Sequence, residues 1–181
     1  MSTINASTIE RDVVSFQIQM LNNVDIGTST SFGSDTKSII DTTKVHFNVG
    51  GFTFAADGVT FPETGYYVIG ATIFYQVQAA GTTNDRVAPE MRFYNVTQSS
   101  NMQPNSIAGM GYSRNLTSSG YNGARNSSLM LTQIVSITAS DKIGIMMRRS
   151  ADTGRDVDVK NNSLFWGFKL RGGIVTGKQF E

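Results

Sequence analysis

Apolar and polar residues alternate with a period of two along most of this chain, whereas stretches with a helical period are almost absent. Phe16, Ile18 and Met20 alternate with glutamines, and the same alternation recurs over residues 45–49. Successive side chains of a β-strand point to opposite faces of the sheet, so this pattern is typical of strands with one apolar and one polar face. The pattern predicts a chain built of β-sheets.

One run, residues 66–78, is apolar on both of its faces and rich in aromatic and β-branched residues. One face carries Tyr67, Ile69, Ala71, Ile73 and Tyr75, and the other carries Tyr66, Val68 and Phe74. We expect such a strand to be covered on both sides, by a second sheet and by another subunit.

Further strands are expected at 91–97, 107–113, 129–138, 143–149 and 163–170. Polar, glycine-bearing connections separate the strands, at 27–36, 79–86, 98–106, 115–127 and 150–162. About eight to ten short strands with turn signals between them indicate an all-β sandwich or barrel. We expect one domain over residues 13–170, with an N-terminal arm at 1–12 and a C-terminal arm at 171–181.

The composition excludes several classes of protein. The 181 residues include no cysteine and one histidine, and the formal net charge is +1. Without cysteine there is no disulfide framework, thiolate nucleophile or sulfur-based metal site, and a near-neutral chain lacks the basic surface of a nucleic-acid binder. No apolar run is long enough to span a membrane, and the N-terminus lacks the pattern of a secretory signal. We expect no nucleic-acid or membrane partner.

No catalytic motif is present. Any histidine-based triad or general base must use His46, which falls on the polar face of its strand, where a solvated or interface-packed histidine is expected. No serine lies in a nucleophile-elbow context, and no glycine-rich turn leads from a strand into a helix. We therefore predict that the protein is not an enzyme and uses no cofactor.

Two charged clusters remain as candidate sites. Asp152, Asp156 and Asp158 could hold calcium, but they lack the EF-hand spacing, and a solvated hairpin connection is the alternative. Arg148 and Arg149 follow an apolar run, where a solvated rim is expected and contact with an acidic partner is the alternative.

The polar connection around residues 112–127 is the best candidate for a ligand-binding loop. Tyr112 and Tyr121 border it, whereas most other aromatic residues fall on the apolar face of an expected strand. Binding residues concentrate on loops that a rigid scaffold positions. A host glycan is the candidate ligand if the alternative function, recognition of a host surface, applies.

Three stretches of the chain resemble the globular heads of complement subunits and the tumour necrosis factor-like jelly rolls. The first is a strand followed by Phe-Asn at 47–48 and Gly-Phe at 51–52. The second resembles the family's Phe-x-Pro-x-x-Gly-x-Tyr strand in the stretch FPETGYYVIGATI, which contributes Phe61, Pro62, Gly65 and Tyr67. The third is similar to a closing Phe-x-Gly-Phe-x-Leu, found here as Phe165, Gly167, Phe168 and Leu170.

The resemblance covers roughly residues 13–170 and implies a ten-stranded jelly roll. It is an antiparallel sandwich of two sheets, which assembles as a compact homotrimer with aromatic residues of the inner sheet around the threefold axis. It implies core or subunit-interface roles for Tyr67, Ile69, Phe165 and Phe168. The sequence has no cysteine, and we expect no collagen stalk, secretory signal or membrane anchor, in which the chain would depart from the family.

The start MSTINASTI and the abundance of Asn, Ser, Thr and Gly are similar to bacteriophage virion proteins. We therefore expect a trimeric structural protein that decorates or cements a phage capsid, assembled in the host cytoplasm and bound to other virion proteins through its terminal arms. The alternative is a receptor-binding tip or tail-fibre head that recognises a host surface glycan.

Overall fold

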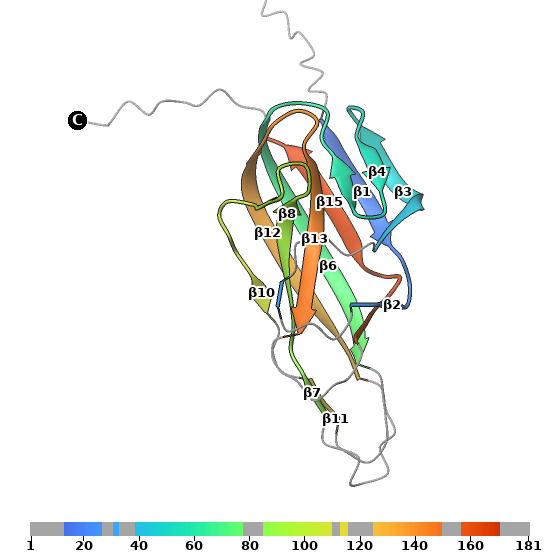
Figure 1. Ribbon diagram of the computed structural model, residues 1–181. Coiled ribbons are helices and arrows are strands. Elements are labelled where there is room, and N and C mark those ends of the chain that lie inside the picture. The colour runs from blue at the N-terminus through green and yellow to red at the C-terminus, as the bar shows by residue number, and fades with distance from the viewer. Residues whose placement is uncertain are drawn as a thin grey trace, which may run out of the picture.

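The computed structural model describes residues 13–26, 31–32, 39–77, 85–109, 113–115, 125–149 and 157–170. These residues form an all-β sandwich of two antiparallel sheets, as the alternation predicts, and the sheets lie one in front of the other in Figure 1. The expected arms at 1–12 and 171–181 lie outside the described residues. No helix in the described part is long and apolar enough to cross a membrane.

The first sheet has seven strands in the order β2-β14-β6-β15-β1-β3, and β12 pairs with β6. Its strands are β1 (Ser15–Met20), β2 (Val24–Asp25), β3 (Ile40–Val49), β6 (Gly65–Val77), β12 (Arg125–Ile137), β14 (Val157–Val159) and β15 (Leu164–Lys169). β12 pairs with β6 along its whole length, so β14 and β15 share the opposite edge of β6. β6, the run with two apolar faces, is therefore paired along both of its edges, whereas β12 forms one edge of the sheet.

The second sheet has six strands, in the order β10-β8-β13-β5-β4 with β9 paired to β8. Its strands are β4 (Thr53–Ala55), β5 (Gly58–Thr60), β8 (Pro89–Asn95), β9 (Ser100–Asn101), β10 (Ala108–Gly109) and β13 (Lys142–Arg149). A separate ribbon pairs β7 (Asp85–Val87) with β11 (Ser113–Asn115). β14 lies within the expected connection 150–162, where a strand of three residues is too short to show a period of two.

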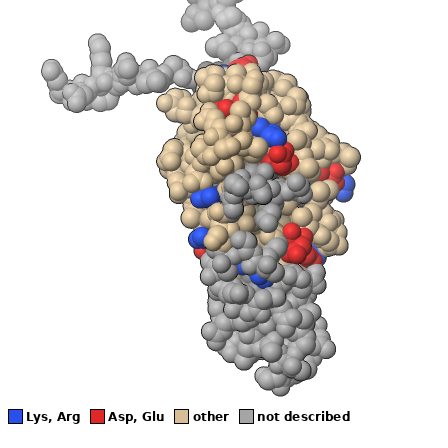
Figure 2. All heavy atoms as spheres, in the orientation of Figure 1, with Lys and Arg blue, Asp and Glu red and all other residues tan. Residues whose placement is uncertain are grey.

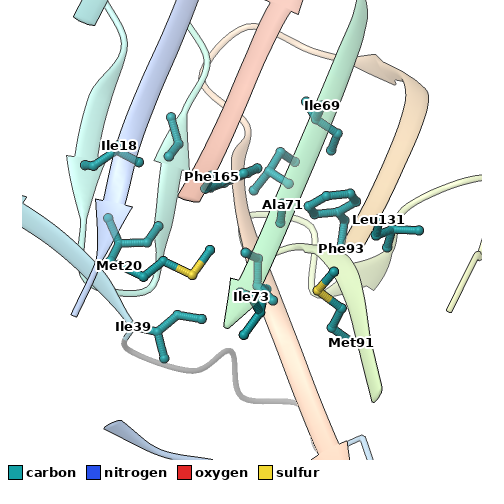
Figure 3. Close-up of a cluster of buried hydrophobic side chains, with 14 of the residues drawn as sticks. Ile18, Met20, Ile39, Ile69, Ala71, Ile73, Met91, Phe93, Leu131 and Phe165 are labelled. Atoms are coloured by element: carbon teal, nitrogen blue, oxygen red, sulfur yellow. The ribbon is translucent and has the colours of Figure 1, made fainter. Parts of the chain in front are cut away.

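Aromatic side chains between the sheets form the centre of the core. The ring of Phe16 lies 5.2 Å from that of Phe165 and 5.7 Å from that of Phe61, in edge-to-face contacts. Phe165 stacks on Phe93 of the opposite sheet, with 5.7 Å between the ring centroids. Figure 3 shows side chains of both sheets, including Ile69, Phe93 and Phe165, pointing into the shared interior. The inward residues of β1, β6 and β15 therefore hold the sandwich together.

The Phe-Asn at 47–48 and the Gly-Phe at 51–52 form the two sides of the turn between β3 and β4. The Asn48 side chain donates to the carbonyl of Phe52 at 2.8 Å and accepts from its N–H at 3.0 Å. Gly50 and Gly51 have φ values of 101° and 88°, which side-chain-bearing residues rarely adopt. The turn places the buried Phe52 against Phe16, with 4.8 Å between the centroids.

Candidate functional site

The outer face of the seven-stranded sheet is the most unusual surface of the described part. The register places Val49, Ser15, Phe168, Val68 and Ile134 side by side on one line across five strands. Directly opposed residues of antiparallel strands point to the same face. Ile134 is 58% exposed, Val49 47% and Phe168 38%, so this line is an apolar strip open to solvent.

A second line runs beside the first and consists of Phe47, Gln17, Trp166, Gly70 and Thr132. The Trp166 indole covers Gly70, because a Cβ at position 70 would lie 2.1 Å from its Cζ2 atom. Trp166 also stacks on Phe168 of the first line, at 6.3 Å between centroids and 9° between planes. Phe47, Gln17, Trp166 and Phe168 line a groove of about 290 Å³.

Further exposed side chains of β6 and β12 extend this surface beyond the two lines. Met130 of β12 is 70% exposed, Tyr66 of β6 54% and Phe74 of β6 42%. We call the whole surface, from β3 across β1, β15 and β6 to β12, the apolar face. Antiparallel sheets that are solvated on one side normally carry polar residues there, so this face has the character of a surface that another molecule covers.

The structure separates the four residues for which core or interface roles are predicted. Tyr67, Ile69 and Phe165 are fully buried between the sheets, whereas Phe168 lies on the apolar face. The Tyr67 hydroxyl donates to the carbonyl of Glu63 at 2.9 Å. Burial raises the pKa of Tyr67 to about 12, and the negative charge of the nearby Glu63 adds to the shift.

Sequence reasoning missed two prominent members of the apolar face, Met130 and Ile134. The signal for them is present in the stretch LMLTQIVSI, where apolar residues occupy both parities of the strand. Leu129 and Val135 point into the core, and Met130 and Ile134 point away from it. β12 therefore shares with β6 a pattern of apolar residues on both faces of the strand.

The expectation of a solvated rim at Arg148 and Arg149 is wrong for Arg149, which is 1% exposed. Arg149 lies opposite Pro89 in the pairing of β13 with β8, and this pairing carries its side chain into the interior. Arg148 donates from Nε to the Glu90 carboxylate at 2.6 Å.

The ring of Phe32 contacts two guanidinium groups: the Cζ atoms of Arg92 and Arg148 lie 4.3 and 4.4 Å from its centroid. Burial and the charge of Arg148 lower the pKa of Arg92. Figure 2 shows acidic and basic side chains in small groups of both signs on the visible face, without a broad area of one charge.

The remaining candidates give no clustered site. His46 is exposed on β3. Asp158 is 6% exposed in β14, with its carboxylate 3.6 Å from Lys160 Nζ, whereas Asp152 and Asp156 lie outside the described residues. Tyr112 and Tyr121, of the expected ligand loop, lie outside them too. Within the described ranges, no three His, Asp or Glu side chains come together in a way that could hold a metal ion.

Comparison with known proteins gives a fold and no activity. No protein-family model matches the chain, and neither does any curated protein sequence. Among solved structures, the chain is similar to the Eiger tumour necrosis factor of S. frugiperda, with a TM-score of 0.51 and 12% sequence identity. The match covers 94% of this chain and 100% of that one. The fold is therefore a jelly-roll sandwich of the tumour necrosis factor type.

Proposed function

We propose that this chain is a structural protein without catalytic activity, which assembles as a homotrimer through the apolar face. The observation that carries the proposal is the exposure of this face, with Met130, Ile134 and Tyr66 each more than half accessible. Monomeric soluble proteins rarely expose contiguous apolar patches larger than a few hundred Å². Further copies of the chain packed against the face would remove these side chains from water.

Burial of the apolar face between copies would favour assembly. Burial of apolar surface contributes about 25 cal/mol per Å², and a standard interface buries about 800 Å² on each partner. The groove between Phe47 and Trp166 offers a depression into which a side chain of a neighbouring copy fits. Interfaces draw most of their energy from a few such aromatic anchors.

Three copies are supported by the resemblance to the tumour necrosis factor-like jelly rolls and by symmetry. The resemblance implies that the sheet containing the closing strand, here β15, packs around a threefold axis. A closed ring covers the same surface on every copy, whereas an open arrangement leaves some copies uncovered.

For the biological setting we propose a capsid decoration or cement role on a phage particle. It is supported by the abundance of Asn, Ser, Thr and Gly and by the style of the N-terminal sequence. In this proposal the segments 1–12 and 171–181 dock on other virion proteins. Deletion of either segment is expected to lower the occupancy of the protein on particles, and unchanged occupancy after both deletions would rule out docking by the arms.

Light scattering of the purified protein tests the assembly. The expected mass is three times 19.7 kDa, and a stable monomer would overturn the proposal. Ile134→Asp places a charge on the part of the apolar face that β12 forms at the edge of the sheet, where packed copies would bury it without a partner. Such a charge costs about 3–5 kcal/mol, so the variant is expected to be monomeric at micromolar concentration.

Ile107→Asp is the matched control. Ile107 is 45% exposed, close to the 58% of Ile134, but it precedes β10 of the other sheet. The control is expected to keep the mass of the unmodified protein. Equal masses for the two variants, whether both trimeric or both monomeric, would show that the apolar face is not the specific contact surface.

A further inference from the structure

A second hollow of about 280 Å³ lies between the segment that follows β8 and the end of β12. Only Met102 among its nine lining residues is apolar, in contrast to the groove on the apolar face. We call it the polar pocket. A concave site with a few convergent polar groups is the usual form of a small-molecule site, and this volume is close to the lower limit for such sites, about 300 Å³.

The floor of the polar pocket is held in place by internal hydrogen bonds. Asp141 is 5% exposed, and its two carboxylate oxygens accept from Gln98 Nε2 at 3.1 and 2.9 Å. The Thr138 N–H donates to the same carboxylate at 3.2 Å. Asn95, 4% exposed, accepts the Gln98 N–H at 3.0 Å. The floor is therefore a fixed acceptor group that needs no rearrangement to receive a ligand.

The rim of the polar pocket carries unused hydrogen-bonding groups. Asn101, Gln103 and Ser136 line it, and none of their side chains makes a hydrogen bond to another residue of the described part. Two amides and a hydroxyl offer both donors and acceptors. Ligand hydroxyl groups both donate and accept, so a hydroxyl-rich molecule matches this mixture.

Charge narrows the class of ligand. Asp141 is the only charged residue among those that line the pocket, and Lys142, next to it in sequence, is bound to Asp57 at 2.7 and 2.9 Å. The pocket is therefore net negative and disfavours phosphates, sulfates and acidic sugars. A hydrogen bond from a hydroxyl to an ionised carboxylate is about twice as strong as a neutral one.

We infer that the polar pocket binds a neutral saccharide, with one sugar unit in the hollow and its hydroxyl groups bonded to Asp141 and to the rim. All residues that line the pocket belong to one copy of the chain, and Ser136 among them lies opposite Tyr66, where the pocket borders the apolar face. The pocket differs from the loop bordered by Tyr112 and Tyr121, for which the sequence predicts glycan binding.

Amide-resolved NMR titration tests the inference, with glucose, galactose, mannose and N-acetylglucosamine as probes. At least one of these sugars is expected to give saturable shifts at the amides of residues 95–103 and 136–141. Glucuronate, which adds a negative charge, is expected to bind at least tenfold more weakly than glucose. Glycerol separates a saccharide site from a general polyol site, because a sugar makes more simultaneous contacts.

Asn101→Ala and Ser136→Ala are the diagnostic variants, because removal of either side chain breaks no hydrogen bond within the described part. Each removes one hydrogen bond to the ligand and is expected to weaken binding about three- to tenfold. Asn126→Ala is the matched control, since Asn126 is an exposed asparagine outside the pocket on the same strand as Ser136.

The expected shifts at the pocket, together with weaker binding by both diagnostic variants and unchanged binding by the control, would support the site. Three results would overturn it: no saturable shift with any neutral sugar at millimolar concentration, shifts confined to other surfaces, or equal binding by all variants. Glycerol binding as tight as that of the sugars would also refute the saccharide assignment.

Discussion

Phe165 and Phe168 lie on the same strand, β15, but point to opposite faces of the sheet. Phe165 is fully buried and contacts Phe16 and Phe93, so its ring connects the two sheets. Phe168 is 38% exposed on the apolar face. Phe165→Ala and Phe168→Ala therefore remove the same atoms from one strand in two different environments, and the pair tests the division between core and interaction surface.

The structure predicts very different energies for the two substitutions. Truncation of a buried phenylalanine costs about 3–5 kcal/mol, because transfer energy is lost and a cavity remains. Phe165 also loses two aromatic contacts worth about 0.5–1.5 kcal/mol each, so we expect about 4 kcal/mol or more. That is a large part of the roughly 5–15 kcal/mol that stabilises a domain. For Phe168→Ala we expect about 1 kcal/mol within a single copy, since its ring is already partly in water.

Urea unfolding followed by far-ultraviolet circular dichroism measures both effects. The unfolding midpoint of an oligomer rises with protein concentration, so each variant is measured at several concentrations. Phe165→Ala is expected to lower the midpoint at every concentration. Phe168→Ala is expected to leave the midpoint of the dissociated chain nearly unchanged and to weaken association in light scattering.

Equal losses of stability from the two substitutions would refute this reasoning, because they would mean that the two faces of β15 are not differently covered. A larger loss from Phe168→Ala at low protein concentration would place its ring, and not that of Phe165, in the core. Either result would invalidate the register on which the apolar face is defined.

Three further predictions concern single side chains. The raised pKa of Tyr67 means that the protonated phenol stabilises the folded protein below about pH 10, and that this stability is lost as the pH rises to about 12. Tyr67→Phe removes the titrating group, so the free energy of unfolding in urea is expected to change less between pH 10 and 12 than in the unmodified protein. Gly70→Ala displaces the indole of Trp166, which costs about 1–3 kcal/mol and shifts its fluorescence, and an unchanged spectrum would contradict the packing of Trp166 on the backbone. Phe32→Ala removes the ring beside Arg92 and lowers stability by about 0.5–2 kcal/mol in thermal unfolding, whereas Phe32→Tyr keeps the ring and is expected to retain most of it.

Much of the sandwich could be predicted from the alternation of residues along the chain. The period of two is a local property, because the geometry of an extended backbone sends successive side chains to opposite faces. Strands β1, β8, β13 and β15 therefore appear close to their expected positions. The two apolar faces of β6 likewise predict cover on both sides: the second sheet covers one of them, and cover of the other by a further copy stays a prediction.

Pairing and packing between distant strands determine which face of each strand is buried, and the local alternation does not. Alternation distinguishes the two faces of β15 but does not say which one points inward, and only the packing of β8 and its neighbours buries Phe165 and leaves Phe168 outside. The burial of Arg149 and the convergence of residues near 98 and 141 on one pocket also arise between segments far apart in sequence. Burial depends on what lies across from a side chain, and that is set by tertiary structure.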